Sequence, residues 1–135
     1  MNVELEQRLV DQFPALFPDG AHCECEDGWY DLIERACRSI VACSPPAGLT
    51  VGRVKEKFGE LRIDIELAGE LLWNNLPENV YKEVCYTLEW AELKSRLVCE
   101  TCGSTEGVGL TVIPPGNYWV KTLCRGCHEN CKQKN

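Results

Sequence analysis

Apolar residues recur with the spacing of an α-helix in three stretches of the chain, residues 3–12, 28–42 and 77–97. Pro14, Pro18 and Gly20 follow the first stretch and end it. Asp27 stands where the N-cap of the second helix is expected, and Pro77 suits the first turn of the third. The pattern therefore predicts three amphipathic helices.

Apolar and charged residues alternate strictly over residues 61–67, which predicts a half-buried strand. Residues 50–54 are predicted to form its neighbour, and residues 55–60, with Gly59, the turn between them. A second hairpin is predicted from residues 107–113 and 118–123, with its turn at 114–117. We therefore expect an α+β fold, with helices packed on a small antiparallel sheet.

The third predicted helix carries apolar residues on two sides. One stripe comprises Val80, Val84, Leu88 and Ala91, and the other comprises Tyr86, Trp90, Leu93 and Leu97. One stripe faces the core, and the other needs a second cover. We expect the C-terminal segment to supply it, with Trp119 packed against the helix, and a second chain is the alternative.

Four cysteines near the C-terminus form two Cys-x-x-Cys knuckles that are separated by 21 residues, namely Cys99, Cys102, Cys124 and Cys127. Each knuckle brings two sulfur atoms within reach of one ion, and Gly103 and Gly126 supply freedom for the turns. Four thiolates favour one structural Zn²⁺ ion. Iron, disulfides or unbound thiols are the alternatives, and His128 or Cys131 is the alternative for one ligand.

A four-sulfur centre leaves no position for an activated water, so we expect the metal to brace the predicted hairpin and not to catalyse hydrolysis. A second cysteine pair lies at Cys23 and Cys25, directly after His22. Three interpretations stay open for this pair: half of another metal site, a thiol-based active centre, and ordinary reduced cysteines.

The composition limits the class of protein. The chain has 135 residues, 44% of them apolar, so it is large enough for one domain with a small metal module. Its net charge of −7 argues against a general phosphate-backbone binder. No apolar run approaches the ~18 residues of a membrane helix, and the N-terminal residues lack a signal-peptide pattern. We expect a cytoplasmic protein in which cysteines serve as ligands or free thiols.

Charge is distributed unevenly along the chain. Residues 1–34 contain nine acidic residues and one arginine, including a cluster of Glu24, Glu26 and Asp27. A local basic group surrounds the predicted turn at residues 55–60, namely Arg53, Lys55, Lys57 and Arg62. Either group is a candidate contact surface, the acidic one for a basic protein partner and the basic one, with Lys121 and Arg125, for nucleic acid.

Several motifs occur in an order that resembles a family of small, largely uncharacterised proteins found in bacteria and in their phages and prophages. The motifs, which span about residues 13–127, are Phe13-Pro-x-Leu-Phe17, Cys25-x-Asp27-Gly28-Trp29-x-x-Leu32-Ile33, Val54-Lys55-Glu56-Lys57-Phe58-Gly59-x-Leu61-Arg62, Cys99-x-x-Cys102-Gly103 and Trp119-x-Lys121-Thr122-Leu123-Cys124-x-x-Cys127. The resemblance implies a compact α+β body with a zinc-binding knuckle pair, and a mobile-element origin. It implies no established reaction.

These observations lead to one functional expectation. We expect an α+β body at residues 1–97 and a zinc-ribbon module at 98–135, packed together as one compact unit. The chain is expected to be no enzyme and to act by protein–protein interaction, as a phage-encoded inhibitor of a host enzyme or defence complex in the manner of an anti-CRISPR protein. If the chain is encoded by a phage, we expect it in the cytoplasm of the host cell, and the sequence leaves open whether it is assembled as a homodimer. Nucleic-acid binding by the zinc ribbon is the alternative function.

Overall fold

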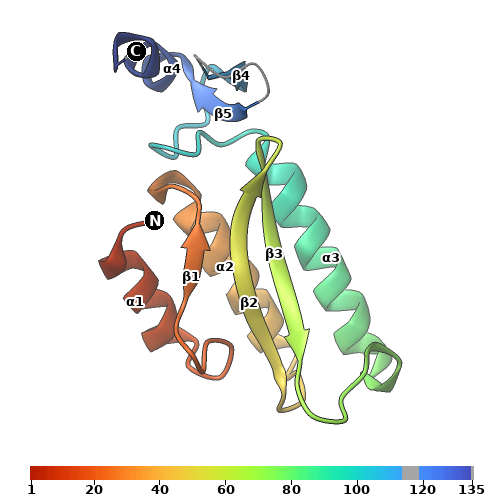
Figure 1. The fold of residues 1–135 in the computed structure, drawn as a ribbon. Helices are drawn as coiled ribbons and strands as arrows, with labels where there is room; N and C mark the ends of the chain where they lie inside the picture. Colours follow the sequence, from red (N-terminus) through yellow and green to blue (C-terminus); the bar gives the residue numbers. More distant parts are fainter. Residues whose placement is uncertain (114–118, 135) are drawn as a thin grey trace.

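The computed structural model describes residues 1–113 and 119–134 and shows an α+β fold (Figure 1). In chain order the elements are α1 Val3–Gln12, β1 His22–Glu24, the 3₁₀ turn η1 Asp27–Trp29, α2 Tyr30–Ala42, β2 Leu49–Lys57, β3 Glu60–Leu67, the 3₁₀ turn η2 Trp73–Asn75, α3 Glu78–Ser95, β4 Val108–Val112, β5 Val120–Cys124 and α4 Arg125–Lys134. The predicted fold class is confirmed.

The body contains a three-stranded sheet in the order β1-β2-β3. β2 and β3 pair antiparallel as predicted, whereas β1 pairs parallel to β2, so the sheet is mixed and not antiparallel throughout. β1 escaped prediction because three residues with a single buried side chain give no periodic signal. α1 lies beside this edge strand, and the N–H of Cys23 donates to Glu6 Oε2 at 3.0 Å.

The hairpin of β2 and β3 differs from the prediction. Residues 55–57 continue the strand, and the turn consists of Phe58 and Gly59 alone. Both turn residues have positive φ, 54° and 80°, as a two-residue type I′ hairpin turn requires. The prediction that the turn begins at residue 55 is therefore wrong, because the charged residues 55–57 also fit a strand with one exposed face.

The helices lie close to their predicted positions. The bounds of α1 are confirmed, and Asn2 Oδ1 caps it by accepting the N–H of Leu5 at 2.9 Å. The predicted N-cap role of Asp27 is wrong, because this carboxylate accepts the N–H of Asn2 at 2.8 Å and the chain enters α2 through η1. α3 begins at Glu78, so Pro77 is its N-cap residue and not its first helical residue, and the helix ends at Ser95, two residues before the predicted end.

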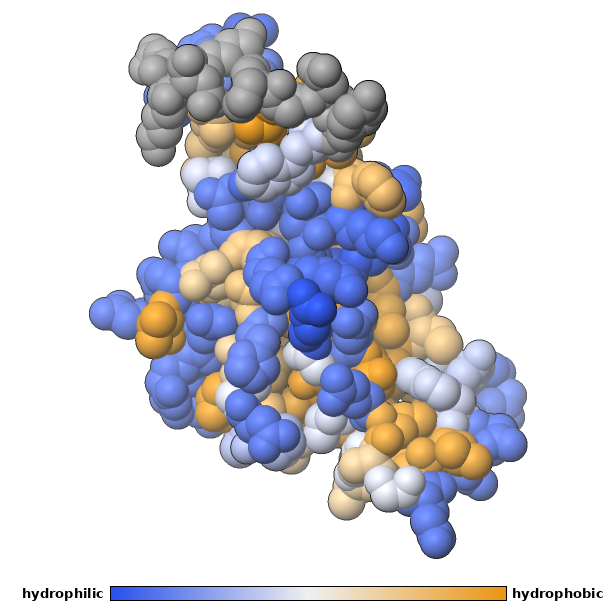
Figure 2. Space-filling view, viewed as in Figure 1, coloured by the Kyte–Doolittle hydropathy of each residue, from blue (hydrophilic) through white to orange (hydrophobic). Residues whose placement is uncertain are grey.

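The core of the body lies between the sheet, α1, α2 and α3 (Figure 1). Trp29, Ile33 and Val54 are among its fully buried side chains. Figure 2 shows that one face of the body is mostly hydrophilic, with a hydrophobic patch at the end away from the C-terminal segment. No helix in the described parts of the chain has both the length and the apolar character to cross a membrane.

The C-terminal segment forms a separate ribbon above the sheet (Figure 1). β4 and β5 pair antiparallel from Val108 opposite Cys124 to Val112 opposite Val120. The turn predicted at 114–117 lies outside the described residues, as does Tyr118. α4 follows β5 directly, and its largely polar sequence gave no amphipathic pattern from which to predict it.

Candidate metal centre

The two knuckles meet at one point, as their spacing predicted. The Sγ atoms of Cys99, Cys102, Cys124 and Cys127 all lie within 4.8 Å of one another, and the Sγ atoms of Cys102 and Cys124 are 3.7 Å apart. Thiolates at about 2.3 Å from a tetrahedral ion lie roughly 3.8 Å apart. None of the four forms a disulfide. These four side chains are therefore placed to bind one metal ion.

The first knuckle is a tight turn at the end of the segment that follows α3. The N–H of Cys99 donates to Ser104 O at 2.8 Å, and the N–H of Gly103 donates to Cys99 O at 2.9 Å. Gly103 has a φ of +81°, a conformation that side chains other than glycine rarely adopt. The prediction of turn freedom is thus confirmed for Gly103.

The second knuckle spans the end of β5 and the first turn of α4. The N–H of Cys127 donates to Cys124 Sγ at 3.4 Å, and this hydrogen bond lowers the pKa of the Cys124 thiol to about 7. A thiolate is the form that binds metal, whereas burial and the neighbouring sulfur atoms raise the pKa of the Cys127 thiol. Gly126 lies within α4 without a positive φ, which shows that its predicted role in turn freedom was wrong.

The alternative ligands fall outside this group. Among the described residues, the only cluster of three or more histidine, cysteine or acidic side chains with suitable spacing is the four-cysteine group, which includes neither His128 nor Cys131. Cys131 packs, as Cys124 and Cys127 do, against the small cluster of Cys99, Ile113 and Leu123, and His128 lines a small cavity with Cys124. The four sulfur atoms alone supply a complete tetrahedral set.

The N-terminal cysteine pair does not form a second cluster of this kind in the part of the chain that the structure describes. Cys23 and Cys25 are buried, with 7% and 5% of their surface exposed. Burial is the largest cause that raises the pKa of each thiol to about 12. Since the thiolate is the reactive form, both behave as core residues at neutral pH.

The first knuckle of the candidate metal centre is packed tightly against the body at Gly28. A Cβ atom built on Gly28 would lie 2.2 Å from Cys99 O and 2.6 Å from Gly103 N. The N–H of Gly28 donates to Glu100 O at 2.7 Å. The helix entry expected at residues 27–29 is confirmed, since η1 leads directly into α2. The structure adds that a glycine is needed at position 28, because the first knuckle leaves no room for a side chain.

Glu100 and Trp29 complete this contact. Glu100 is 2% exposed, its Oε2 accepts the N–H of Glu26 at 3.1 Å, and burial raises the pKa of its carboxyl to about 7. Trp29 Nε1 donates to Val98 O at 2.9 Å. Sequence reasoning missed Glu100, because an acidic residue between two ligands gives no signal of burial.

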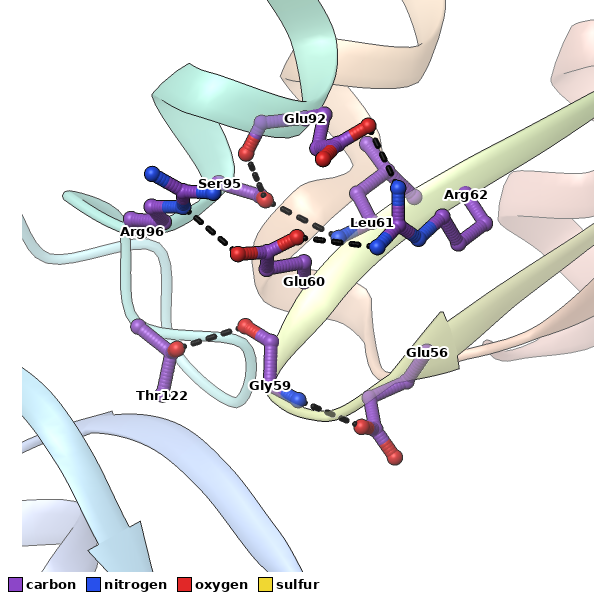
Figure 3. Close-up of polar contacts among 9 residues, drawn as sticks. All are labelled: Glu56, Gly59, Glu60, Leu61, Arg62, Glu92, Ser95, Arg96 and Thr122. Carbon is purple, nitrogen blue, oxygen red and sulfur yellow. Dashed lines mark hydrogen bonds and ion pairs between the residues drawn. The ribbon is translucent and has the colours of Figure 1, made fainter.

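A second contact joins the ribbon to the β2–β3 turn. Thr122 Oγ1 donates to Gly59 O at 2.6 Å, and Glu56 Oε2 accepts the N–H of Gly59 at 2.7 Å (Figure 3). On the other side of the turn, Glu60 binds both Arg62 and Arg96. This network places the turn between α3 and β5, so two motifs that lie far apart in the sequence meet here.

The predicted basic contact residues are largely engaged by acidic side chains. Arg53 pairs with Glu24 at 2.6 Å, Lys55 lies 3.6 Å from Asp64, and Arg62 pairs with Glu60 and with Glu92 at 2.5 Å. Lys57 lies over the Phe58 ring, 5.9 Å from its centroid. The structure therefore brings these residues to one hairpin but surrounds them with carboxylates.

The predicted acidic contact residues lie at the same end of the body. Glu24 is opposite Lys55 in the β1–β2 register, Glu26 binds Lys121 and accepts from Thr101, and Asp27 binds Asn2. Each of them thus contacts its own chain, and the acidic and basic groups of the prediction form one mixed surface.

The predicted packing of Trp119 on α3 is wrong. Trp119 is 56% exposed, and its Nε1 lies 3.4 Å from Glu56 Oε1. The ribbon sits at the end of the sheet and leaves the stripe of α3 uncovered, with Leu93 and Leu97 48% and 59% exposed. The helical pattern could show that the stripe exists but not where the ribbon docks.

No family model, no curated protein and no solved structure matches this chain.

Proposed function

We propose that this protein is a non-catalytic zinc-binding protein that acts by binding another protein. The observation that carries the proposal is the set of four thiols within 4.8 Å of one another. Zinc suits four thiolates in a tetrahedron, and a site filled by four protein ligands has no position for a reacting water. The ion would thus hold the ribbon in place and take no part in a reaction.

The state of the remaining candidate nucleophiles supports a non-enzymatic role. Cys23 and Cys25 are the thiols that the sequence offers for catalysis, and burial raises the pKa of both to about 12. A catalytic cysteine needs a thiolate near neutral pH and access for the substrate. These two side chains have neither.

The contact surface that we propose lies at the junction of the β2–β3 turn and the ribbon. Four apolar side chains here are more than half exposed, and we call them the junction patch: Phe58, Leu110, Val112 and Trp119. Leu110 lies over Gly59, next to Phe58. Exposed apolar side chains gathered between polar residues are typical of protein interfaces.

Phe58 adds a second reason to choose this patch. Its φ of +54° is unfavourable for a large side chain, and a type I′ turn prefers asparagine at this position. Strained residues that persist on a surface often serve a function. We infer that Phe58 is kept for contact with a partner.

The identity of the partner is an extension of the same proposal. The resemblance to phage and prophage proteins suggests a host enzyme or defence complex, which this protein would inhibit in the host cytoplasm. The net charge of −7 and the acidic residues 1–34 favour a partner with a basic surface. Nucleic acid is a weaker candidate, because Arg53, Lys55 and Arg62 are paired with carboxylates.

The test compares three tagged proteins in a host lysate: the unchanged chain, a Phe58→Asn/Trp119→Ala variant, and a Val41→Ser control. Val41 is a 44% exposed apolar residue on α2, away from the junction. We expect one protein to be retained by the unchanged chain and the control and lost by the variant. The captured protein is then purified and its binding to each of the three is measured by calorimetry.

Three results contradict the proposal. The first is equal capture by the junction-patch variant and the control. The second is salt-sensitive binding of DNA or RNA that falls when Arg53 and Lys57 are changed to glutamine, which favours the nucleic-acid alternative. The third is purified protein without a tightly bound metal ion.

A further inference from the structure

The outer side of α3 carries an apolar stripe that the described chain leaves mostly uncovered. Tyr86, Leu93 and Leu97 are 69%, 48% and 59% exposed, whereas Trp90 is partly buried against the core and lies beneath the Arg35 guanidinium. Together with Glu89 and Lys94 they line a shallow groove of about 290 Å³. Figure 1 shows the sheet and α2 on the inner side of α3, and no described element on its outer side.

The stripe is symmetric about its own centre. Trp90 and Leu93 lie at equal distances on either side of the midpoint between residues 91 and 92, and so do Tyr86 and Leu97. Leu97 lies in the turn just after α3, which ends at Ser95, and lines the same groove. A second α3 that runs antiparallel about this midpoint places Trp90 opposite Leu93 and Tyr86 opposite Leu97. Each aromatic ring then meets a leucine, which is the large-to-small pairing that fills a helix interface.

The charges beside the stripe complement each other in the same arrangement. Glu89 and Arg96 lie seven residues apart, hence on one flank of the stripe. A two-fold axis through the midpoint keeps equivalent flanks together, so Glu89 lies near Arg96 of the second copy, and the pair occurs twice. Arg96 donates through Nε to Glu60 at 2.6 Å, and its side chain stays 52% exposed.

We propose that this protein forms a two-fold homodimer through antiparallel contact of α3 with α3 of a second copy. The contact is small, with four apolar side chains from each copy, which is fewer than the about 20–30 residues a side of a stable interface. The dimer is therefore weak and reversible and depends on protein concentration. This assembly goes beyond the proposed function, since it uses α3 and leaves the junction patch open.

The experiment is sedimentation equilibrium of the full chain, metal-loaded and under reducing conditions, from about 1 µM to about 1 mM, a range that spans weak affinities. We expect a monomer–dimer equilibrium that Leu93→Glu abolishes. Val41→Glu places the same charge on an exposed apolar position of α2 and is the matched control, expected to leave the equilibrium unchanged. Circular dichroism verifies that each variant is folded.

A charge exchange tests the register. Glu89→Arg alone and Arg96→Glu alone each bring like charges together and are expected to weaken the dimer by about fivefold. Glu89→Arg with Arg96→Glu restores opposite charges and is expected to recover most of the affinity. A double variant as weak as the single ones overturns the antiparallel register.

Other outcomes overturn the dimer itself. If the unchanged chain stays monomeric over the whole range of protein concentration, a second copy does not occupy the groove on α3. A dimer that survives Leu93→Glu places the interface elsewhere. Capture of a different protein that Leu93→Glu releases, with no dimer formed, assigns the groove to that protein. None of these results depends on the junction patch, so each of the two proposals can be contradicted without affecting the other.

Discussion

The body and the metal module of this chain are held together by different means. Among the described residues, the core of the body is one cluster of 21 buried side chains between Leu9 and Ala91. The module has three, Cys99, Ile113 and Leu123, and one of these is a candidate ligand. A hydrophobic cluster this small does not support a fold by itself, so we propose that the ribbon draws its stability from a metal ion at the four cysteines and from the body.

The body and the module are therefore expected to respond differently to the loss of metal. The body has its own buried core, whereas the module contacts the body at Gly28, Glu100 and Gly59, and we propose that it also depends on metal binding by the four cysteines. Because those contacts come from backbone atoms and buried polar groups, the module is fixed in position once the metal is bound. A loss of metal should therefore release the ribbon and spare the body.

The largest expected effect follows from the loss of one ligand. Cys102 is exposed, so Cys102→Ser removes a thiolate with little loss of packing. We expect the free energy of unfolding of the module to fall by roughly 5 kcal/mol or more, since structural zinc contributes about 10–16 kcal/mol to folding. Amide hydrogen exchange checks this through lost protection in β4 and β5 alone.

The control for this change is Cys85→Ser, at an exposed cysteine on α3 outside the metal group. It is expected to bind metal and to melt like the unchanged chain. If both variants behave alike, the four-sulfur centre does not hold the ribbon.

Thiol alkylation distinguishes the buried cysteines of the body from the exposed and candidate metal-binding cysteines. Burial raises the pKa of Cys23, Cys25 and Cys37 to about 12, so below that pH their thiolate fraction falls tenfold per pH unit, to about a thousandth of an ordinary thiol's. At pH 8 we expect mass spectrometry to find Cys85 modified early and these three unmodified. After a chelator has removed the metal, we expect the four candidate ligand cysteines to be modified as well, while the three core cysteines stay unmodified.

This experiment can also contradict the comparison. Rapid modification of Cys23 or Cys25 in the folded protein would mean that the body is open at β1. Such a result would restore the thiol-based active centre as a hypothesis.

A smaller effect is expected at the close contact between the two parts. Gly28→Ala puts a methyl group 2.2 Å from Cys99 O, where backbone must move, and should lower the free energy of unfolding by about 2–3 kcal/mol. It should also weaken metal binding, which a competition titration with a chromophoric chelator measures.

Gly126→Ala is the matched control, because a Cβ atom at this position of α4 meets no atom within 4 Å. Alanine is expected to stabilise the helix by about 0.5–1 kcal/mol. Equal destabilisation by both substitutions would remove the argument for tight packing at Gly28.

The smallest expected effect is a gain in stability when Phe58 is replaced. Phe58→Asn replaces a bulky residue at φ +54° by the residue that type I′ turns prefer. We expect the free energy of unfolding, measured by thermal denaturation, to rise by about 0.5–1 kcal/mol. A fall in stability instead would mean that the Phe58 ring packs on the body and is no free contact surface.

Long periodic elements were predictable from the sequence, because their patterns arise from burial of one face. The bounds of α1 and the alternation of β3 follow directly from their apolar residues. The meeting of the four candidate ligands was equally predictable, since two knuckles of fixed spacing suit one tetrahedral ion.

The remaining features depend on contacts between distant segments. β1 exists because β2 and Glu6 supply its partners, and the burial of Glu100 depends on Glu26 and Lys121. The docking of the ribbon at Gly59 instead of on α3 was unpredictable for the same reason. No local pattern encodes which of two apolar surfaces a module chooses.

The central claim is that one metal ion holds the ribbon to a body that folds without it. Elemental analysis of freshly purified protein, combined with hydrogen exchange before and after chelation, tests it most directly. The account predicts one zinc ion per chain, and on its removal a loss of protection in Val108–Val112 and Val120–Cys124 while α2 and β3 stay protected. Metal-free protein with an equally protected ribbon would contradict it.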